Sequence, residues 1–503
     1  MSDGLNLSMF RAYDVRTPAS SLTPELSVRL ARAEARYFRE VLDVPGVVVA
    51  HDARTSGPAY LEAAIDEYLR VGLDVLHLPG VTSTPLFYFG AMQHPEYAAV
   101  MFGASHNPAG DTGRKVLGPN VTPIARNVGP AGGLESIRQF YLEDRPLPSA
   151  PSGRARARDV VADYVSYSIQ LAGVRPGSLH GVRVFHDYLN GAAGREMMLG
   201  FERAGADLTP MHFVANGQFP LGDPNPVKEA VVSSGLNAFR QGGFLLGTFF
   251  DGDGDRIDFY AGDGRYVSSS FVYAAILPYI RERFSQPGLG VFADLKSNPL
   301  AVMEMAKTGV TVQVIRNGHS QIKQAMLDDP RFFGTVEESA HFYEAFFLNG
   351  RGPYCTENSL YISLLVTRAW HENPARFEEL LGIQARTSRA REWGYKFPTD
   401  QQRADALQAV EEHFESLGAT CMRQTRGGLD LEATLMRRGI PFDIDASTRL
   451  ADDWLQVCHR ISQSEDGLAR WEVVGANPEI VAEAKRQIGE IVRCHGAGEE
   501  YRG

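Results

Sequence analysis

The sequence has few cysteines, no long apolar run and no basic leader. Its four cysteines are widely spaced in 503 residues and form no C-x-x-C pair, which excludes a disulfide framework and the usual zinc patterns. Sparse cysteine usage is typical of the reducing cytoplasm, where we expect the protein to reside. Because no uninterrupted apolar run reaches about 18 residues, we expect no transmembrane helix. The first residues carry no basic segment before an apolar core, so we expect no signal peptide.

Positive charge is also scarce. The chain has 50 Lys and Arg against 61 Asp and Glu, a net charge of -11, which argues against binding to nucleic acid or anionic membranes. An anionic substrate would therefore need a local concentration of positive side chains. The shares of hydrophobic and charged residues, 44% and 22%, fit a soluble globular protein. A chain of 503 residues is too long for one hydrophobic core and predicts about three or four domains.

Predicted strands alternate with predicted helices through most of the chain, which is typical of an α/β fold. Thr23-Pro24-Glu25 is an N-cap, a proline and a first-turn acid, and it predicts a helix to about residue 41. The other predicted strands are 47–50, 75–78, 98–102, 182–187, 244–250, 290–294 and 310–315, with helices at about 58–71 and from about 160, 190, 269, 299 and 319.

The character of the sequence changes at two places. A Pro- and Ser-rich stretch at 146–153 is typical of a linker, and after about residue 386 longer charged helical stretches surround one late strand, 453–458. We therefore predict three similar mixed α/β domains followed by a C-terminal α+β domain. Their predicted ranges are 1–157, 158–267, 268–385 and 386–503.

Three aspartates at alternate positions follow the predicted strand 244–250, namely Asp251, Asp253 and Asp255. Alternate residues of an extended chain project to the same side, so their carboxylates repel one another unless a cation with a preference for oxygen ligands lies between them. The adjacent Arg256 would favour an anionic ligand such as phosphate. The spacing resembles an EF-hand, but the sixth and twelfth positions are arginine and glycine instead of Gly and Glu. An acidic surface turn without a ligand remains an alternative.

A serine directly follows the predicted strand 98–102, in the segment Gly103-Ala104-Ser105-His106-Asn107-Pro108. Polar loops at strand ends are where open α/β sheets place ligand sites. The Asn-Pro pair fixes a turn, and Lys115 could stabilise a negatively charged oxygen of Ser105 or its phosphate. The alternative is an ordinary serine in a turn.

Later loops carry further polar clusters. Residues 337–341 (Glu-Glu-Ser-Ala-His) suit the recognition of sugar hydroxyls, although a helix start is an alternative. Lys296, at the end of a predicted strand, could have its pKa lowered by partial desolvation so that it shuttles protons. Residues 318–320 (Gly-His-Ser) offer another imidazole. Residues 460–465 (Arg-Ile-Ser-Gln-Ser-Glu) form either a phosphate clamp or a common surface loop.

Taken in order, these loops resemble the α-D-phosphohexomutase family, in particular its phosphomannomutase/phosphoglucomutase branch. Residues 10–16 (F-R-A-Y-D-V-R) resemble its opening motif, 51–57 its D-x-R-x-S-[GS], and 104–108 its A-S-H-N-P phosphoserine loop, with 113–115 at its G-x-K. Residues 251–256 resemble its metal loop, 337–341 its E-x-S-G-H and 460–465 its R-x-S-[NG]-T-E. The resemblance spans all four predicted domains.

The resemblance implies a heart-shaped α/β protein whose four domains surround a central cleft. It implies reversible phosphoryl transfer between the 1- and 6-positions of mannose and/or glucose phosphates, through a hexose 1,6-bisphosphate that also activates the enzyme. It implies that Ser105 is the phosphorylated nucleophile and that Ser105, Asp251, Asp253 and Asp255 hold Mg²⁺.

The resemblance also assigns the remaining site residues. The implied catalytic residues are Arg256, Tyr13 and Arg16 around the transferring phosphate, Lys115, and Lys296 and His341 as general acid and base. The implied substrate-binding residues are Glu337, Ser339 and His319 for the sugar, and Arg460, Ser462, Gln463 and Ser464 for the non-reacting phosphate.

The chain departs from the family pattern at several positions. Gly103 stands where many members have Thr, Ala340 replaces the usual Gly, and residues 463, 464 and 466 depart from the pattern of the phosphate loop. The segment 118–133 is unusually rich in proline and glycine. His319 stands where aminosugar-specific members usually carry Asp, which favours a plain hexose. We expect small hexose phosphates as partners, no nucleic acid or membrane, and a monomer or homodimer.

Three alternatives remain open. One is a phosphoglucosamine mutase. The second is a metal-dependent phosphatase that works through a serine phosphate; such sites generally need two metals and several histidines, and we expect the histidines here not to cluster with the Asp loop. The third is a non-catalytic sugar-phosphate sensor, which would have no need for a phosphorylatable serine beside a metal.

Overall fold

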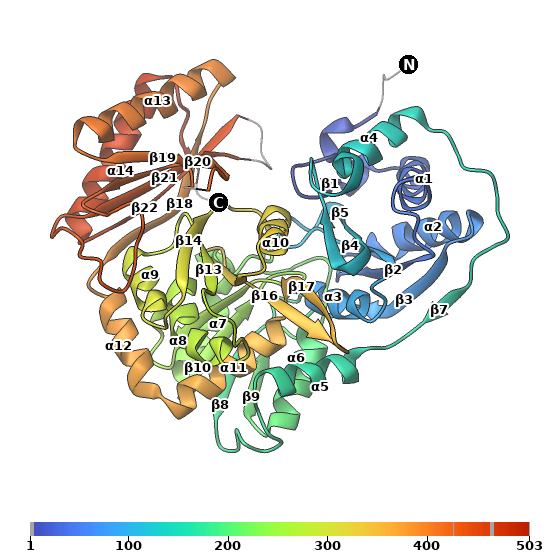
Figure 1. Ribbon diagram of the computed structural model, residues 1–503, viewed down its shortest axis with the longest axis horizontal. Helices are drawn as coiled ribbons and strands as arrows, with labels where there is room; N and C mark the ends of the chain where they lie inside the picture. The colour runs from blue at the N-terminus through green and yellow to red at the C-terminus, as the bar shows by residue number, and fades with distance from the viewer. Residues whose placement is uncertain (1–4, 426, 463–466, 502–503) are drawn as a thin grey trace. The chain divides into compact units, whose positions relative to one another are not determined.

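The structure, a computed structural model, describes residues 5–425, 427–462 and 467–501 (Figure 1). The chain groups into two compact units. The first unit comprises Met1–Val267, Gly318–Pro330 and Ser339–Glu372, and the second comprises Ser268–Asn317, Arg331–Glu338 and Asn373–Gly503. The division into four domains remains a prediction from the sequence.

The N-terminal part of the first unit is built on a sheet with the strand order β1-β5-β4-β2-β3-β7, with β6 beside β5. Strands β2, β3, β4 and β7 are parallel, and β1 and β6 run antiparallel to β5. The strands are β1 (Val15–Pro18), β2 (Gly46–His51), β3 (Asp74–Val81), β4 (Ala98–Phe102), β5 (Asp111–Gly118), β6 (Thr122–Ile124) and β7 (Ala155–Ala157). The helices are α1 (Pro24–Glu40), α2 (Gly57–Arg70), α3 (Thr84–Met92) and α4 (Leu134–Glu143), and 3₁₀ turns occupy Leu7–Met9, Ala19–Ser21, Pro119–Val121 and Pro130–Gly132.

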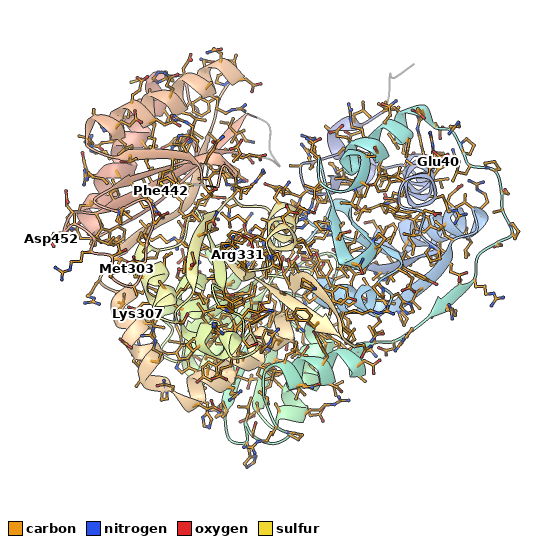
Figure 2. All side chains as sticks on the ribbon, viewed as in Figure 1. Glu40, Met303, Lys307, Arg331, Phe442 and Asp452 are labelled. Atoms are coloured by element: carbon orange, nitrogen blue, oxygen red, sulfur yellow. The ribbon has the colours of Figure 1, made fainter. Side chains whose placement is uncertain are left out.

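Helix α1 shows how this layer is held together. The Thr23 side chain accepts a hydrogen bond from the Leu26 amide and caps the first turn. Its buried face packs with α2 and α4 over a core that includes Leu30, Tyr37 and Phe38. At its last residue, Glu40 accepts from Arg36 and Arg145; Glu40 is labelled among the side chains in Figure 2.

A second sheet of the first unit has the order β12-β11-β10-β8-β9, in which β8, β9 and β10 are parallel and β10 and β11 form an antiparallel hairpin. Its strands are β8 (Arg183–Asp187), β9 (Asp207–Met211), β10 (Leu246–Phe250), β11 (Ile257–Ala261) and β12 (Tyr266–Val267). The helices here are α5 (Val161–Leu171), α6 (Gly194–Ala204) and α7 (Glu229–Gln241). The first unit also contains α10 (His319–Asp328), the antiparallel strands β16 (His341–Leu348) and β17 (Arg351–Glu357), and α11 (Ser359–Glu372).

The second unit begins with parallel strands in which β13 lies between β14 and β15. These are β13 (Gly290–Asp294), β14 (Thr311–Ile315) and β15 (Phe332–Glu337), with helices α8 (Ser269–Arg281), α9 (Pro299–Ala306) and α12 (Pro374–Gln384). Its C-terminal part is an antiparallel sheet with the order β19-β20-β21-β22-β18-β23. The strands are β18 (Ser388–Lys396), β19 (Thr420–Gln424), β20 (Asp430–Arg438), β21 (Leu455–Ile461), β22 (Leu468–Gly475) and β23 (Glu500–Tyr501), with helices α13 (Asp400–Ser416) and α14 (Pro478–Cys494).

The predicted multi-domain α/β fold class is confirmed, with two differences in detail. The predicted linker is followed at once by β7, which pairs with β3 and extends the first sheet. The sequence predicted one strand after residue 386, whereas the structure has a six-stranded sheet there. No helix of the described residues is both long and apolar enough to cross a membrane.

Candidate active site

Ser105 lies in the loop between β4 and β5, buried and with a left-handed φ of 48°. Non-glycine residues rarely adopt this conformation unless their surroundings impose it. The surroundings here are the guanidinium of Arg54, which is buried and donates to backbone carbonyls along the loop. Its acceptors are Ser105 O at 2.9 Å, Asn107 O at 2.6 Å, Pro108 O and Asp111 O at 3.1 Å. One side chain therefore fixes the path of the backbone that presents the serine.

Asp52 also holds the Ser105 loop in place. Its carboxylate accepts from the amides of Ala104 and Arg54, at 3.1 and 2.9 Å. A Cβ on Gly103 would lie 2.4 Å from Asp52 Oδ2, so no larger residue fits there without moving the carboxylate. The glycine that departs from the family pattern at this position is thus explained by the close approach of Asp52.

The Asp loop connects β10 to β11. Asp251, Asp253 and Asp255 are only 0%, 2% and 3% exposed, so the alternative of an acidic surface turn is wrong. One carboxylate oxygen of each lies within 4.8 Å of the others. The Ser105 hydroxyl donates to Asp251 Oδ2 at 2.9 Å, although the two residues are 146 positions apart. The predicted serine and metal loops therefore meet.

Two side chains donate hydrogen bonds to the Oδ2 atoms of Asp253 and Asp255. Lys115 Nζ donates to Asp253 Oδ2 at 2.8 Å and to Asp255 Oδ2 at 2.6 Å. Thr84 Oγ1 donates to Asp253 Oδ2 at 2.6 Å, and its backbone amide donates to Asp253 O at 2.8 Å. The sequence placed Lys115 beside the serine oxygen or its phosphate; in the structure it is the counter-ion of the aspartates.

The remaining oxygens suit a hard divalent cation. Among the described residues, Asp253 Oδ1 and Asp255 Oδ1 are buried and have no hydrogen-bond donor. A buried carboxylate oxygen without a donor is costly, and a cation would satisfy it. The set consists only of oxygen ligands, as Mg²⁺ and Ca²⁺ prefer. The donor set therefore fits the implied metal.

The protein does not treat the three carboxylates alike. Burial and the charges of Asp253 and Asp255 raise the pKa of Asp251 well above its usual range. Burial opposes ionisation of Asp253 too, but Lys115 and Thr84 outweigh it and lower its pKa. Burial lowers the pKa of Lys115, but the charges of Asp253 and Asp255 outweigh burial, so the pKa is raised well above its usual range and Lys115 stays cationic. One aspartate is thus ionised by the protein itself, and the others need further positive charge.

Two histidines lie against this cluster, which corrects the expectation that they would not. Arg256 Nε donates to His341 Nε2 at 3.2 Å, and His341 Nδ1 lies 3.7 Å from Asp255 Oδ1. Arg256 Nη2 lies 3.4 Å from His106 Nε2, and His106 Nδ1 lies 3.2 Å from Ser105 Oγ. Because a guanidinium only donates, His106 Nε2 accepts, and Nδ1–H is left to donate to Ser105. Burial, with the charges of Arg256 and Arg16, lowers the pKa of His106 well below its usual range and keeps it neutral.

Two other predicted site residues of the first unit are Arg16 and His319. Arg16 Nη1 donates to Ala104 O at 2.6 Å and to Asn107 Oδ1 at 2.7 Å, so it binds the serine loop itself. His319 begins α10, and its ring stands edge-on to Tyr13, with centroids 5.8 Å apart. Burial and nearby lysines lower the pKa of His319, which favours a neutral ring.

The predicted sugar loop is a turn between β15 and β16, so the alternative of a helix start is wrong. Ser339 is half-buried in this turn, and Ala340 has a left-handed φ of 72°. This is the conformation for which glycine is the usual residue. The Ala340 carbonyl accepts from the Ile257 amide at 2.8 Å, which joins the turn to the strand after the Asp loop.

Lys296 follows β13 in the second unit, buried between acids. Its Nζ lies 3.8 Å from Asp294 Oδ2 and 3.9 Å from Glu472 Oε2. Burial alone would lower the pKa of Lys296, but the carboxylates outweigh it and the pKa is raised. The expected lowering is therefore wrong, because desolvation could be inferred from the sequence and the contact with the distant Glu472 could not.

Glu337, at the end of β15, shares a donor with Asp294. Asn317 Nδ2 lies 2.8 Å from Glu337 Oε1 and from Asp294 Oδ2. Burial and the charges of Glu338 and Glu337 raise the pKa of Asp294 to about 7. Glu338 accepts from Ser268 and Arg389, so of the two adjacent glutamates only Glu337 shares a hydrogen-bond donor with Asp294.

The predicted phosphate clamp contains an acid that the sequence did not indicate. Arg460, on β21, donates to Glu392 Oε2 at 2.9 Å, and Arg470 donates to Glu392 Oε1 at 2.7 Å. Burial is outweighed by these cations, and the pKa of Glu392 is lowered. The Ser462 amide donates to Leu468 O at 2.9 Å. The predicted clamp residues Gln463 and Ser464 lie outside the described residues.

Sequence reasoning gave no individual role to several residues of these clusters. They are Asp52, Arg54, Thr84, His106, Asp294, Lys323, Glu357 and Glu392. Asp52 and Arg54 lay in the recognisable segment 51–57, and His106 lay in the serine motif 104–108. Thr84, Lys323, Glu357 and Glu392 contact partners far away in the chain, which leaves no local signal.

Comparison with known proteins finds similarity to sugar-phosphate mutases. The profile described as phosphoglucomutase/phosphomannomutase, alpha/beta/alpha domain I, matches residues 7–131, and that of domain II matches residues 162–264. The chain is 26% identical over 382 residues to a phosphomannomutase of Escherichia coli, which covers 72% of this chain and 80% of the relative. It is 27% identical over 341 residues to a phosphoglucosamine mutase of Carboxydothermus hydrogenoformans, covering 66% and 74%.

The fold is also shared with solved structures. A phosphoglucomutase/phosphomannomutase family protein of Burkholderia thailandensis superposes with a TM-score of 0.77 at 18% identity. The superposition covers 98% of this chain and 99% of the other. The likeness therefore extends from one end of the chain to the other.

Proposed function

We propose that the chain is a member of the α-D-phosphohexomutase family of isomerases, and that it moves a phosphoryl group reversibly between the 1- and 6-positions of a hexose phosphate, mannose and/or glucose. The observation that carries the proposal is the meeting of Ser105 with the buried Asp loop, at 2.9 Å from Asp251. A serine that cycles through a phosphate needs compensating positive charge, and that loop is built to hold it.

Each half-reaction exchanges one P–O bond for another. When phosphoserine is the donor, the Ser105 Oγ–P bond breaks and a bond from phosphorus to a sugar hydroxyl oxygen forms. The hydroxyl proton passes to a base, and the leaving Ser105 Oγ takes up a proton from an acid. The bisphosphate formed then returns its other phosphoryl group to Ser105, with the proton moving back. Positioning and charge compensation carry such transfers, because the transition state spreads negative charge over the phosphoryl oxygens.

Arg256 and Arg16 are the cations proposed to bind those oxygens. Arg16 is attached to the serine loop, and Arg256 bridges His341 and His106. Mg²⁺, held by Asp251, Asp253, Asp255 and the serine phosphate, would neutralise charge on the phosphoryl group. Lys115 keeps two of these aspartates in place.

The acid and base are proposed to be His341 and Lys296. His341 Nε2 carries a lone pair, which accepts from Arg256 in this structure. Once Arg256 turns to a phosphoryl oxygen, as proposed above, this lone pair is released and can take a hydroxyl proton. Lys296 has a raised pKa and suits the role of acid or cationic hydrogen-bond donor. Glu337, Ser339 and His319 are proposed to bind sugar hydroxyls. Arg460 and Ser462, with Gln463 and Ser464, are proposed to bind the second phosphate.

The decisive experiment compares Ser105→Ala with Ser152→Ala, an exposed serine of the predicted linker. Wild-type protein should contain a fraction about 80 Da heavier, with the added phosphate located on Ser105. A coupled assay with glucose 1-phosphate, mannose 1-phosphate or glucosamine 1-phosphate, in the presence of Mg²⁺ and hexose 1,6-bisphosphate, should show turnover. Ser105→Ala should lose both signals and Ser152→Ala neither. Full mutase activity in Ser105→Ala would end the proposal.

The same assay separates the alternatives. Preference for glucosamine 1-phosphate would indicate the activity after which the Carboxydothermus hydrogenoformans relative is named. Release of inorganic phosphate without isomerisation would indicate a phosphatase. Binding without turnover would indicate a sensor.

A further inference from the structure

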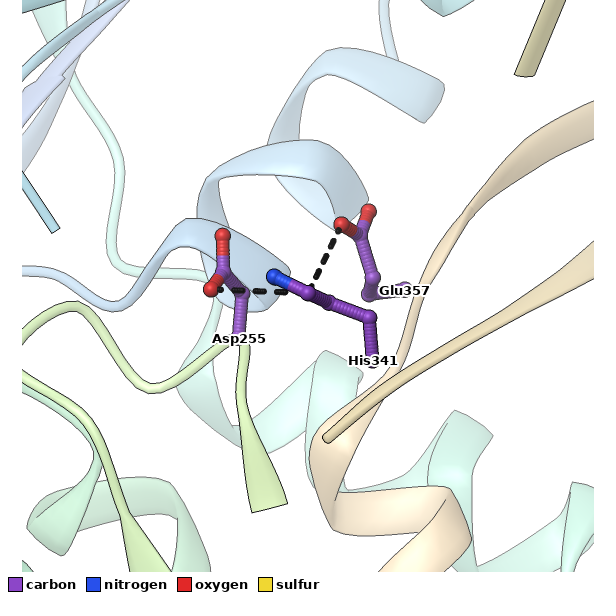
Figure 3. A group of neighbouring side chains, drawn as sticks. All are labelled: Asp255, His341 and Glu357. Carbon is purple, nitrogen blue, oxygen red and sulfur yellow. Dashed lines mark ion pairs between the residues drawn. The ribbon is translucent and has the colours of Figure 1, made fainter. Parts of the chain in front are cut away.

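We propose that Glu357 is a positioning residue for His341: its carboxylate holds the imidazole in the tautomer that carries hydrogen on Nδ1 and so keeps the lone pair on Nε2. The inference rests on the proposed role of His341 as base. Glu357 ends β17 and is 2% exposed. Figure 3 shows His341 between Glu357 and Asp255, with Glu357 Oε1 at 3.8 Å and Asp255 Oδ1 at 3.7 Å from Nδ1.

The tautomer follows from the donor on the other side of the ring. Arg256 Nε can only donate, so His341 Nε2 accepts its hydrogen bond at 3.2 Å. A neutral ring then carries its hydrogen on Nδ1, the tautomer that is less populated in water. The acceptors nearest to Nδ1 are Asp255 Oδ1 and Glu357 Oε1, at 3.7 and 3.8 Å, which are ion-pair separations longer than a hydrogen bond. Asp255 Oδ1 belongs to the proposed cation site, so Glu357 Oε1, which is buried and has no donor among the described residues, is the acceptor available to the ring. A carboxylate behind an imidazole commonly fixes ring orientation and tautomer in this way.

The Nε2 side of the ring is the side that connects to the serine, through Arg256 and His106. The guanidinium that donates to His341 Nε2 also lies 3.4 Å from His106 Nε2, and His106 lies 3.2 Å from Ser105 Oγ. A ring with the other tautomer would direct an N–H at Arg256 and have no lone pair towards the serine. The same tautomer argues against a cation among Asp255, His341 and Glu357, because a metal would need a bare Nδ1.

Glu357 is itself fixed by an ion pair with Lys323. Lys323 Nζ lies 2.7 Å from Glu357 Oε2 and donates to Tyr88 OH at 2.9 Å, and both charged groups are almost fully buried. One carboxylate oxygen thus takes the lysine and the other faces the histidine. A competing explanation must be tested, namely that Glu357 serves only to neutralise the buried lysine.

The test uses two double variants that remove both charges, because replacing a buried ion pair by uncharged residues of similar size is often neutral for stability. Glu357→Gln with Lys323→Met keeps an acceptor oxygen at position 357, whereas Glu357→Met with Lys323→Met does not. We expect both to melt near the wild type. The Met double variant should lose about 100-fold in kcat, the usual size of a general acid–base contribution, with KM nearly unchanged. The Gln double variant should recover at least about a tenth of the wild-type kcat.

Equal kcat in the two double variants, at the wild-type or at a reduced level, would overturn the inference, and so would a change confined to KM. A second measurement does not depend on turnover. In ¹⁵N-histidine spectra, with His341 assigned from the variant His341→Gln, the wild type should show hydrogen on Nδ1, and the Met double variant should lose that signature. If the wild type does not isomerise hexose phosphates, the proposed function fails, while the spectra still decide the role of Glu357.

Discussion

Thr84→Val should weaken divalent cation binding at the Asp loop. Thr84 Oγ1 donates to Asp253 Oδ2 at 2.6 Å, and both side chains are buried. This bond and that of Lys115 both go to Oδ2, and Oδ1 has no donor among the described residues. Valine has nearly the same shape and cannot donate, so the carboxylate loses one of the two groups that orient it.

The expected loss of cation affinity in Thr84→Val depends on the hydrogen bonds that Asp253 keeps. Hydrogen bonds to atoms that orient metal ligands typically contribute 10- to 100-fold in metal affinity. Lys115 still holds the same oxygen at 2.8 Å, and the Thr84 amide still donates to Asp253 O at 2.8 Å. We therefore expect the lower end, a loss of about 10-fold in affinity, or roughly 1.4 kcal/mol.

The assay is direct titration with Mn²⁺ followed by electron paramagnetic resonance, with calorimetric Mg²⁺ titration as a second measure. Thr84→Ser is the matched control, because it keeps the hydroxyl, and its affinity should stay within about 3-fold of the wild type. Wild-type affinity in Thr84→Val would refute the reasoning. Equal losses in both variants, or a melting temperature that falls with the affinity in Thr84→Val, would show that the residue acts only through packing.

Three further changes have defined outcomes. Ala340→Gly should raise the free energy of unfolding in urea by about 0.5–1 kcal/mol, because relief of the left-handed backbone strain exceeds the entropy that glycine adds to the unfolded chain. Ala369→Gly, inside α11, should lower the free energy of unfolding. Burial raises the pKa of Glu196 to about 7, so the folded protein favours the protonated form and the free energy of unfolding falls as the pH rises from about 4.5 to 7. Glu196→Gln should remove roughly 3 kcal/mol of this fall, measured by unfolding at pH 5 and 8. Glu392→Gln should tighten the binding of inorganic phosphate in calorimetric titration, because the carboxylate now competes for Arg460, and unchanged or weaker binding would contradict this.

The sequence predicted those features whose cause lies within a few residues. Thr23 was recognised as a cap because capping depends on the next three amides, and the Asp loop was recognised because alternate residues share a side. The strand β7 was missed because three residues after a Pro-rich stretch carry no pattern of their own and are fixed by pairing with β3. The C-terminal sheet was missed for a similar reason, since its exposed positions interrupt the apolar pattern of β19 and β20.

The partners of the site residues could not be predicted. Thr84 and Asp253 are 169 positions apart, and Glu392 and Arg460 are 68 apart, so neither contact has a local signature. The direction of the pKa shift of Lys296 was wrong for the same reason, because Glu472 comes from a distant strand. Resemblance located the loops, and only the fold shows which side chains neutralise one another.

The pairing of Lys115 with two aspartates has a consequence for exchange of the cation. An ammonium group on the chain cannot diffuse away, so Asp253 and Asp255 keep a counter-charge whichever ion is bound or leaving. If the loop binds a divalent ion as proposed, departure of the ion would leave repulsion centred on Asp251, and a proton would relieve it because the pKa of Asp251 is raised. The loop would then keep its fold during ion exchange, and exchange would not require opening of the hairpin that carries it.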